Sequence, residues 1–335
     1  MANNPASQEQ IVVHGALPPI LDMANDVADI ESQRQALLAL TNLAANEINH
    51  AAMMGRGVLH ILVDAYSSPD LDCREYAAFC IANMCSNPDY LIQVGASGAI
   101  PALVMISKSH NINTQCLGLA ALRRLADADE NWARLIQCGT LEALAAAGFS
   151  TEVEIQREVA AAICSLSLSE SHRLEIAYKC IKTIIQLSVS GDGEVARQAV
   201  GGLANLAEDV ETHEHIAKGN GGRCLVALQA HKSLDIQREA TRAIANLLSS
   251  FRHQATVIED GIPGLVSLAY STDDECAYHA AMCFRKLSPN LKSHPILVYA
   301  GGFKSLFHLL KSTNINTQKQ AGGALRDVCA NSDYK

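Results

Sequence analysis

Apolar residues recur along this chain at the spacing of one buried helix face. The stretch 236–249 places Ala240, Ile244 and Leu247 three and four residues apart, which is typical of an amphipathic helix. Polar and charged residues occupy the opposite side of the same helix. The pattern therefore predicts a helix with one face in a core and the other toward solvent or a ligand.

This helix recurs eight times at a nearly fixed period. With Asn246 as position zero, steps of 40 or 41 residues separate the equivalent positions, which are Asn42, Asn83, Arg124, Ser165, Asn205, Asn246, Lys286 and Asp327. Apolar pairs from Ile20-Leu21 to Leu306-Phe307 keep the same phase. A fixed period in this range predicts a solenoid of stacked helical units.

Three positions of the helix are nearly always apolar or small, and we expect them to form the core. The position after zero is Leu, Met or Val. The position two before zero holds Leu40, Ile81, Leu122, Ile163, Leu203, Ile244, Phe284 and Leu325. The position six before zero is mostly small, which lets a neighbouring helix approach closely, and it holds Ala36, Ala77, Gly118, Val159, Ala199, Ala240, Ala280 and Ala321.

Each unit is expected to contain three helices. Gly15, Gly98 and Gly139 each stand five residues before an apolar pair, where the chain turns from a first helix to a second. Polar residues such as those of 109–114 then connect the second helix to the long third one. The predicted fold is all-α, a single domain over 1–335 with units at about 1–46, 47–87, 88–128, 129–169, 170–209, 210–250, 251–290 and 291–335.

The chain resembles the armadillo-repeat family. Two stretches carry the resemblance, GAIPALV at 98–104 and AIANLL at 243–248. The resemblance covers essentially the whole chain and implies a right-handed α-solenoid of about eight repeats. It also implies that third helices line a concave groove for extended peptides, held by asparagines at position zero. The tryptophans of nuclear-import adaptors are missing four residues before zero, so the groove looks more like those of β-catenin or the vacuolar armadillo protein.

The candidate groove combines these asparagines with basic residues. The residues we expect to contact a peptide are Asn42, Asn83, Arg124, Arg157, Arg197, Asn205, Arg238, Arg242, Asn246 and Lys286. Positions zero, four before and eight before number 24 in eight helices and carry eight basic and two acidic residues, a net charge of +6. Because Arg157, Arg197 and Arg238 repeat at one position, a row of arginines would attract an acidic segment. The alternative is a solvated face neutralised by Glu158 and Glu239.

Composition narrows the function classes. The net charge of −9 argues against a general nucleic-acid binder, and no apolar run reaches the ~18 residues of a membrane helix. Eleven cysteines without a CxxC pair favour a reducing, cytoplasmic setting. His213 and His215 do not share a helix face, and the glycine-rich 219–222 lacks a following Lys-Ser/Thr. We therefore expect neither a metal nor a cofactor.

The leading interpretation is a non-enzymatic adaptor or scaffold that binds an acidic or mixed-charge protein segment. The alternatives are a structural component of an axonemal or junctional assembly, using the convex face, and a regulator of small GTPases. Neither end shows a distinct polar capping unit. We therefore expect Val12, Val13, Leu325 and Val328 to be partly uncovered, in a chain that continues or self-associates there.

Overall fold

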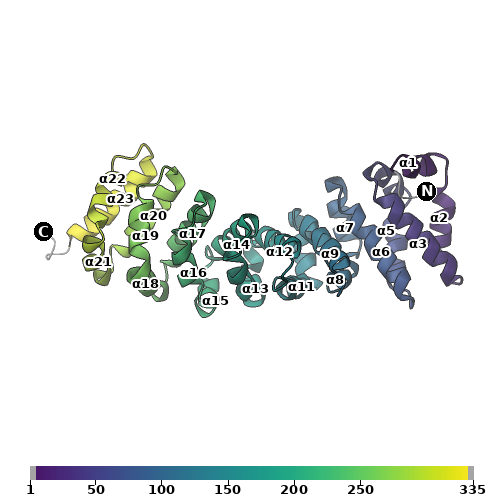
Figure 1. Cartoon of the computed structure of the whole chain (residues 1–335), viewed down its shortest axis with the longest axis horizontal. Helices are drawn as coiled ribbons and strands as arrows, with labels where there is room; N and C mark the ends of the chain where they lie inside the picture. The colour runs from purple at the N-terminus through teal and green to yellow at the C-terminus, as the bar shows by residue number, and fades with distance from the viewer. Residues whose placement is uncertain (1–4, 331–335) are drawn as a thin grey trace. The chain divides into compact units, whose positions relative to one another are not determined.

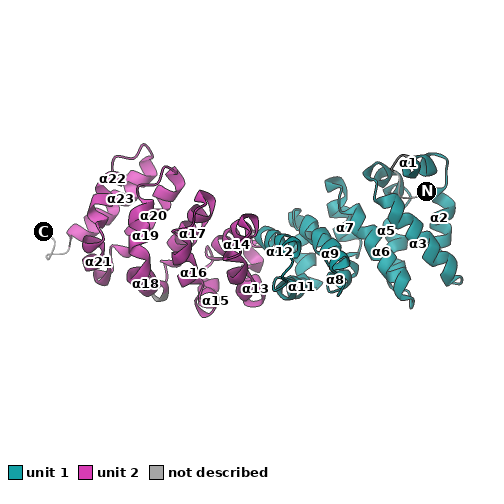
Figure 2. Ribbon diagram, viewed as in Figure 1, with its two compact units in different colours: residues 1–166 teal, residues 167–335 magenta. Residues whose placement is uncertain are grey.

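Helices are the only regular secondary structure in the part of the chain that the structure describes. The computed structural model describes residues 5–330, with the backbone alone for residues 5, 6, 251 and 252, and that range contains no strand (Figure 1). The helices form two compact units, residues 1–166 and 167–335 (Figure 2). The all-α class is confirmed, whereas the single continuous domain stays a prediction.

The long third helices form the framework of each unit. In unit 1 they are α3 (Ile30–Ala44), α6 (Leu71–Met84), α9 (Ile112–Leu125) and α12 (Val153–Leu166). In unit 2 they are α14 (Gly193–Leu206), α17 (Leu234–Leu247), α20 (Asp274–Leu287) and α23 (Ile315–Cys329). Within each unit, every third helix packs against the next one. Six of the eight begin after a side chain that accepts a backbone N–H of the first turn: Asp29, Asp70, Asn111, Asp192, Asp273 and Asn314.

Shorter helices complete the repeats. The second helices are α2 (Leu17–Asn25), α5 (Val58–Tyr66), α8 (Ile100–Ile106), α11 (Thr140–Ala147), α16 (Gly221–Leu228), α19 (Ile262–Leu268) and α22 (Gly302–Leu309). The first helices are α1 (Pro5–Val13), α4 (His50–Met54), α7 (Leu91–Ala96), α10 (Trp132–Gln137), α15 (His213–Lys218), α18 (Phe251–Thr256) and α21 (His294–Tyr299). Short 3₁₀ turns precede α4, α7, α10, α13 (Arg173–Ser188), α15 and α21.

Two repeats depart from the three-helix pattern predicted for every unit. A left-handed residue makes the turn between first and second helices in the other six: Gly15, Gly57, Gly98, Gly139, Asn220 and Gly301. Lys179 and Asp260 stand at that place in the fifth and seventh repeats. A lysine does not readily adopt positive φ, so the fifth repeat has one helix, α13 (Arg173–Ser188). The seventh repeat instead passes through a π-helical turn, Val257–Gly261.

The predicted core positions are buried. In the column two before zero, seven side chains from Leu40 to Phe284 are at most 1% exposed, and Leu325 is half-buried. The small column is buried throughout. The expectation for the ends was partly wrong: Val13 is 69% exposed and Val12 half-buried, but Val328 is only 2% exposed.

The side chain that begins the first helix of a repeat forms a hydrogen bond with a backbone carbonyl at the end of the preceding third helix. Nε2 of His213 lies 2.9 Å from the Ala207 carbonyl oxygen, and Nε1 of Trp132 donates to the Ala126 carbonyl at 2.8 Å. Nε2 of His294 lies 2.7 Å from the Ser288 carbonyl oxygen, again six residues earlier. Helix ends leave such carbonyls without a partner, so these side chains have a structural task.

Gly118 tests the close packing of the small column. A Cβ on Gly118 would lie 2.7 Å from the Ser107 backbone nitrogen, so that helix α8 would have to shift. We expect Gly118→Ala to destabilise the protein by about 1–3 kcal/mol. This is opposite in sign to the ~0.5–1 kcal/mol gain usual for glycine to alanine inside a helix.

Gly322 provides the matched control, because a Cβ there meets only Leu310 Cδ2 at 3.7 Å. Gly322→Ala should therefore stabilise α23. Thermal melts followed by circular dichroism measure both changes. Equal gains in the two variants would mean that α8 and α9 are not held as closely as described.

Candidate binding face on the third helices

The ten candidate residues lie on the third helices, four on unit 1 and six on unit 2. In each unit, a side chain at position zero bonds the backbone carbonyl of the residue just before position zero in the preceding repeat. In unit 1, Nδ2 of Asn83 donates to the Thr41 carbonyl at 3.1 Å. In unit 2, Nζ of Lys286 donates to the Ala245 carbonyl at 2.6 Å. Asn42, Arg124 and Asn246 are half-buried, and Arg157 is exposed on α12.

Two arginines eight residues before zero, Arg34 and Arg238, form ion pairs that link consecutive repeats. Arg34 reaches Glu31 at 2.7 Å and Asp70 of the next repeat at 2.8 Å. Arg238 pairs in the same way with Asp273 of the next repeat, so the two pairs share one geometry.

Further carboxylates surround the cations of unit 2. Arg238 also lies 3.4 Å from Asp235 and 3.2 Å from Glu275, and Arg197 pairs with Glu194 at 2.6 Å. The hydrogen bond from Arg238 lowers the pKa of Asp273 to about 2. The prediction of a mutually repelling arginine row was therefore wrong for Arg197 and Arg238. The partners also differ from those proposed, because Glu158 pairs with Arg123 at 2.8 Å.

Asn205 is occupied by internal hydrogen bonds. Its Nδ2 donates to Ser167 Oγ at 3.0 Å, and its Oδ1 accepts from Arg242 at 2.8 Å. Arg242 also pairs with Glu208 and Glu239, each at 2.7 Å. The Asn205 side chain is consequently buried, with the residue 7% exposed. Both polar atoms of the Asn205 amide thus have a partner inside the chain, and a role of Asn205 in holding a peptide stays a prediction.

Arg124 and Lys286 differ from the candidate residues Arg197, Arg238 and Arg242, which are ion-paired. Neither has a carboxylate partner within 4.0 Å among the residues that the structure describes. Lys286 is half-buried, and burial lowers the pKa of its amine. A cation that has already lost part of its hydration costs less to desolvate when an anion binds. Lys286 is therefore the groove cation best prepared to receive a carboxylate.

A depression of about 550 Å³ opens beside Lys286 on unit 2. Met282 and Arg285 on α20 line it together with Gln320 on α23. The remaining lining residues follow the ends of α17 and α20, and they are Leu248, Ser249 and Pro289. Its apolar surfaces and two cations give it the mixed character of a peptide-binding site.

Sequence reasoning missed most of this lining. Arg285 and Gln320 lie one helical position away from the columns chosen for the groove. Arg285 pairs with Asp327, which is therefore not an independent acidic charge in the groove. The four-residue spacing between Met282 and Lys286 was available as a signal for one continuous surface.

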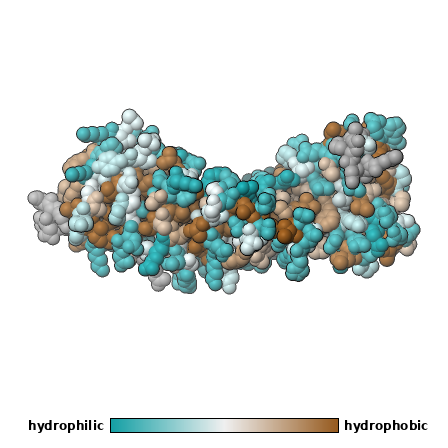
Figure 3. Space-filling model, viewed as in Figure 1, coloured by the Kyte–Doolittle hydropathy of each residue, from teal (hydrophilic) through white to brown (hydrophobic). Residues whose placement is uncertain are grey.

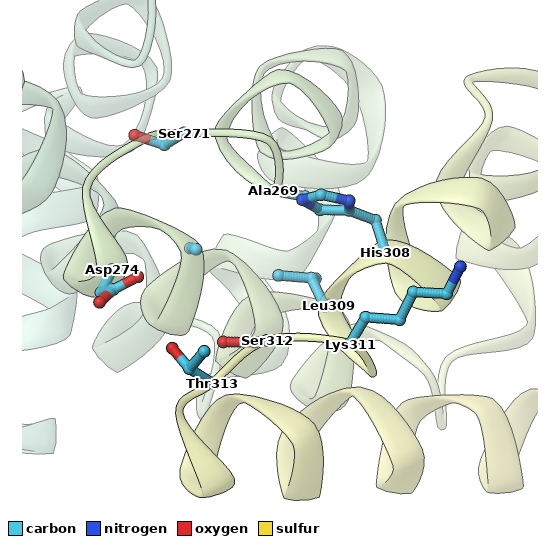
Figure 4. Close-up of a pocket in the computed structure, with 9 residues that line it drawn as sticks. Ala269, Ser271, Asp274, His308, Leu309, Lys311, Ser312 and Thr313 are labelled. Atoms are coloured by element: carbon cyan, nitrogen blue, oxygen red, sulfur yellow. The ribbon is translucent and has the colours of Figure 1, made fainter.

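A smaller depression of about 150 Å³ lies where α20 begins (Figure 4). Ser271 and Asp274 line one side, and His308, Leu309 and Lys311 line the other. The His308 ring lies 4.6 Å from the ring of Tyr270. Because one water takes up ~30 Å³ in the liquid, this depression suits a few waters rather than a peptide.

Metal sites and membrane-spanning helices are two other features a chain of this length can carry. Residues 5–330 contain no group of three or more His, Cys, Asp or Glu side chains that could hold a metal ion. Over the same range, no single helix is long and apolar enough to cross a membrane. One pair of helices, Pro88–Ala96 and Ile100–Ile106, meets the length and composition test together, with a bend of 101° between them.

Comparisons with known proteins agree with the repeat pattern. The model of the Armadillo/beta-catenin-like repeat matches residues 4–45. Vacuolar protein 8 of Schizosaccharomyces pombe is 25% identical over 257 residues, which are 74% of this chain and 45% of that protein. Vacuolar protein 8 of Candida albicans is 28% identical over 188 residues, 55% of this chain and 32% of that protein. The chain thus spans less than half the length of these relatives.

Solved structures extend the match along the chain. The crystal structure of an engineered protein aligns with a TM-score of 0.79 at 29% identity, over 98% of this chain and 82% of its own. A designed armadillo repeat protein in complex with the peptide (KR)4 aligns with a TM-score of 0.62 at 24% identity, over 68% of this chain and 99% of its own. The protein is an α-solenoid of armadillo repeats, and the predicted resemblance is confirmed.

Proposed function

We propose that this protein is a non-enzymatic scaffold that binds an extended, acidic segment of a partner protein on its third helices. The armadillo fold is typical of protein-binding scaffolds. The observation that carries the proposal is the depression beside Lys286, where apolar surface and a cation without a carboxylate partner among the described residues lie together. An acidic segment would place a carboxylate at Lys286 and apolar side chains over Met282 and Pro289, which line the depression and are partly or fully exposed.

The groove proposed here differs in the sign of its charge preference from the similar designed protein. The designed protein is in complex with (KR)4, a basic peptide. In this chain, the groove columns have a net charge of +6 by sequence. Ion pairs with Glu194 and Asp273 offset Arg197 and Arg238, whereas Lys286 on α20 and the exposed Lys319 on α23 keep their charge available to a ligand. A basic peptide would be repelled there, so the ligand preference should be the reverse.

Two peptides of opposite charge test the proposal. We expect a fluorescein-labelled peptide of alternating Glu and Leu to bind the protein at least ~10-fold more tightly than one of alternating Lys and Leu, a difference of ~1.4 kcal/mol. Binding should weaken as salt is raised, because partly exposed charges are screened. Fluorescence anisotropy measures both affinities. Tighter binding of the lysine peptide to this protein would refute the acidic-ligand proposal.

A further inference from the structure

Exposed hydrophobic side chains gather at one place in the repeat. The surface in Figure 3 is mainly hydrophilic, with hydrophobic patches between polar residues. Nearly half of the large hydrophobic side chains that the described residues expose lie between the end of a second helix and the first residue of a third. They are Val27, Ile30, Leu71, Ile112, Phe149, Val153, Val189, Leu234, Tyr270, Leu310 and Ile315.

Unit 1 presents this feature in all four of its repeats. The first residue of each third helix is aliphatic: Ile30 is 39% exposed, Leu71 55%, Ile112 51% and Val153 36%. Each of these four residues, together with the residue before it and the residue after it, belongs to a surface that we call the rim of unit 1. The rim comprises residues 29–31, 70–72, 111–113 and 152–154. Capping a helix requires no aliphatic side chain at its first position. The helices themselves therefore do not explain the rim aliphatics.

Acidic residues flank the aliphatic ones. The twelve residues of the rim include six carboxylates and no basic side chain: Asp29, Glu31, Asp70, Asp72, Glu152 and Glu154. Asp29 and Asp70 cap their helices, and the helix dipole favours the other acids. The acidic residues by themselves would therefore not indicate a binding site. The side chains of Glu31 and Asp72 nevertheless stay 67% and 53% exposed beside the aliphatic residues, although both pair with Arg34.

We propose that the rim of unit 1 binds a basic amphipathic helix of a partner protein. The aliphatic residues provide an apolar contact in each repeat. The six carboxylates outnumber Arg34, which pairs with three of them, so the rim keeps a negative charge that attracts lysine or arginine. An anionic membrane or a nucleic acid would instead be repelled by these carboxylates. This surface lies at the starts of the third helices of unit 1, and it shares no residue with the depression beside Lys286.

The spacing of the rim favours a helix over an extended chain. Neighbouring helices pack about 8–10 Å apart, so one aliphatic side chain is presented at roughly that interval. Residues seven apart on a helix lie on the same face and are separated by about 10.5 Å. In an extended strand, side chains on one face repeat at about 6.6 Å, every second residue. The partner helix should therefore carry an aliphatic residue at every seventh position, with basic residues beside it.

A designed peptide is the probe for this surface. It is a fluorescein-labelled 22-residue helix with leucine at every seventh position, lysine at the flanking positions, and alanine and glutamine elsewhere. The rim variant Leu71→Ser, Ile112→Ser, Val153→Ser should bind it at least ~10-fold more weakly than the wild type. A control variant changes three aliphatic residues outside the rim that are more exposed as a set, namely Val13→Ser, Ile48→Ser and Ile92→Ser, and should keep the wild-type affinity within about twofold.

Two further peptides test the register and the conformation. A peptide of the same composition with the leucines moved off the seven-residue spacing should bind weakly, as should one with two central prolines. Circular dichroism checks that both protein variants keep wild-type helicity. The inference is overturned if the rim and control variants bind alike, if either altered peptide binds as tightly as the original, or if the wild type does not bind at ~100 μM peptide.

Discussion

Replacing Phe284 by alanine is expected to lower the local free energy of opening around α20 by about 3–5 kcal/mol. Phe284 is fully buried and is the largest side chain in its core column. It stands where the other repeats have leucine or isoleucine, so the space around it is fitted to a ring. Truncation would remove apolar burial and leave a cavity that rigid neighbouring helices cannot close.

Hydrogen exchange is the suitable measurement, because repeat arrays can open locally rather than as one cooperative unit. Amides of α20 and of its neighbours α17 and α23 should lose protection. Phe307→Ala is the matched control, since Phe307 is 57% exposed on α22, and it should change protection by less than ~0.5 kcal/mol. Equal effects of the two substitutions would argue against the described core.

Replacing Arg238 by glutamate is expected to destabilise unit 2 by about 1–3 kcal/mol at neutral pH. Arg238 is surrounded by Asp235, Asp273 and Glu275 from two consecutive repeats. The substitution would remove their cation and add a fourth carboxylate. Arg223→Glu makes the same charge change at an exposed position and should alter stability by no more than ~0.5 kcal/mol.

The effect of Arg238→Glu should depend on pH. Because the pKa of Asp273 is lowered to about 2, against ~3.9 in an unfolded chain, its contribution to stability is complete above about pH 4. That contribution is lost as the pH falls toward 2. The difference in stability between wild type and variant should therefore shrink on acidification, as measured by urea unfolding between pH 7 and pH 3. A difference that grows on acidification would contradict the ion-pair assignment.

The sequence pattern predicted the repeat architecture because period and burial are properties of single columns. Leu122 and Ala240 could be assigned to the core from their spacing alone. The loss of the inter-helix turn in the fifth repeat was also readable in principle, since Lys179 replaces a glycine at a place that requires positive φ. Asp260 replaces the glycine in the seventh repeat in the same way, but the sequence did not indicate that a π-helical turn would form there.

The candidate site was harder to predict, because its electrostatics depend on side chains about 35 residues apart. Arg34 pairs with Asp70, and Arg242 reaches back to Glu208. Reading each column alone gave a row of free arginines. Comparing the arginine column of one repeat with the helix-capping aspartates of the next repeat would have placed Asp70 beside Arg34. Replacing arginines of this row by glutamate would leave stability unchanged only if they formed no ion pairs. Arg238 is ion-paired, so its replacement should lower stability.

The most direct test of the proposed groove is the affinity of the Glu-Leu peptide for the Lys286→Met variant. Methionine keeps much of the side-chain volume of lysine and removes the charge that would contact a carboxylate. Lys304→Met removes an exposed charge on α22, outside the depression. We predict at least ~10-fold weaker binding for Lys286→Met, unchanged binding for Lys304→Met, and wild-type helicity for both. Equal affinity of Lys286→Met and wild type would show that this part of the third-helix face is not the binding surface.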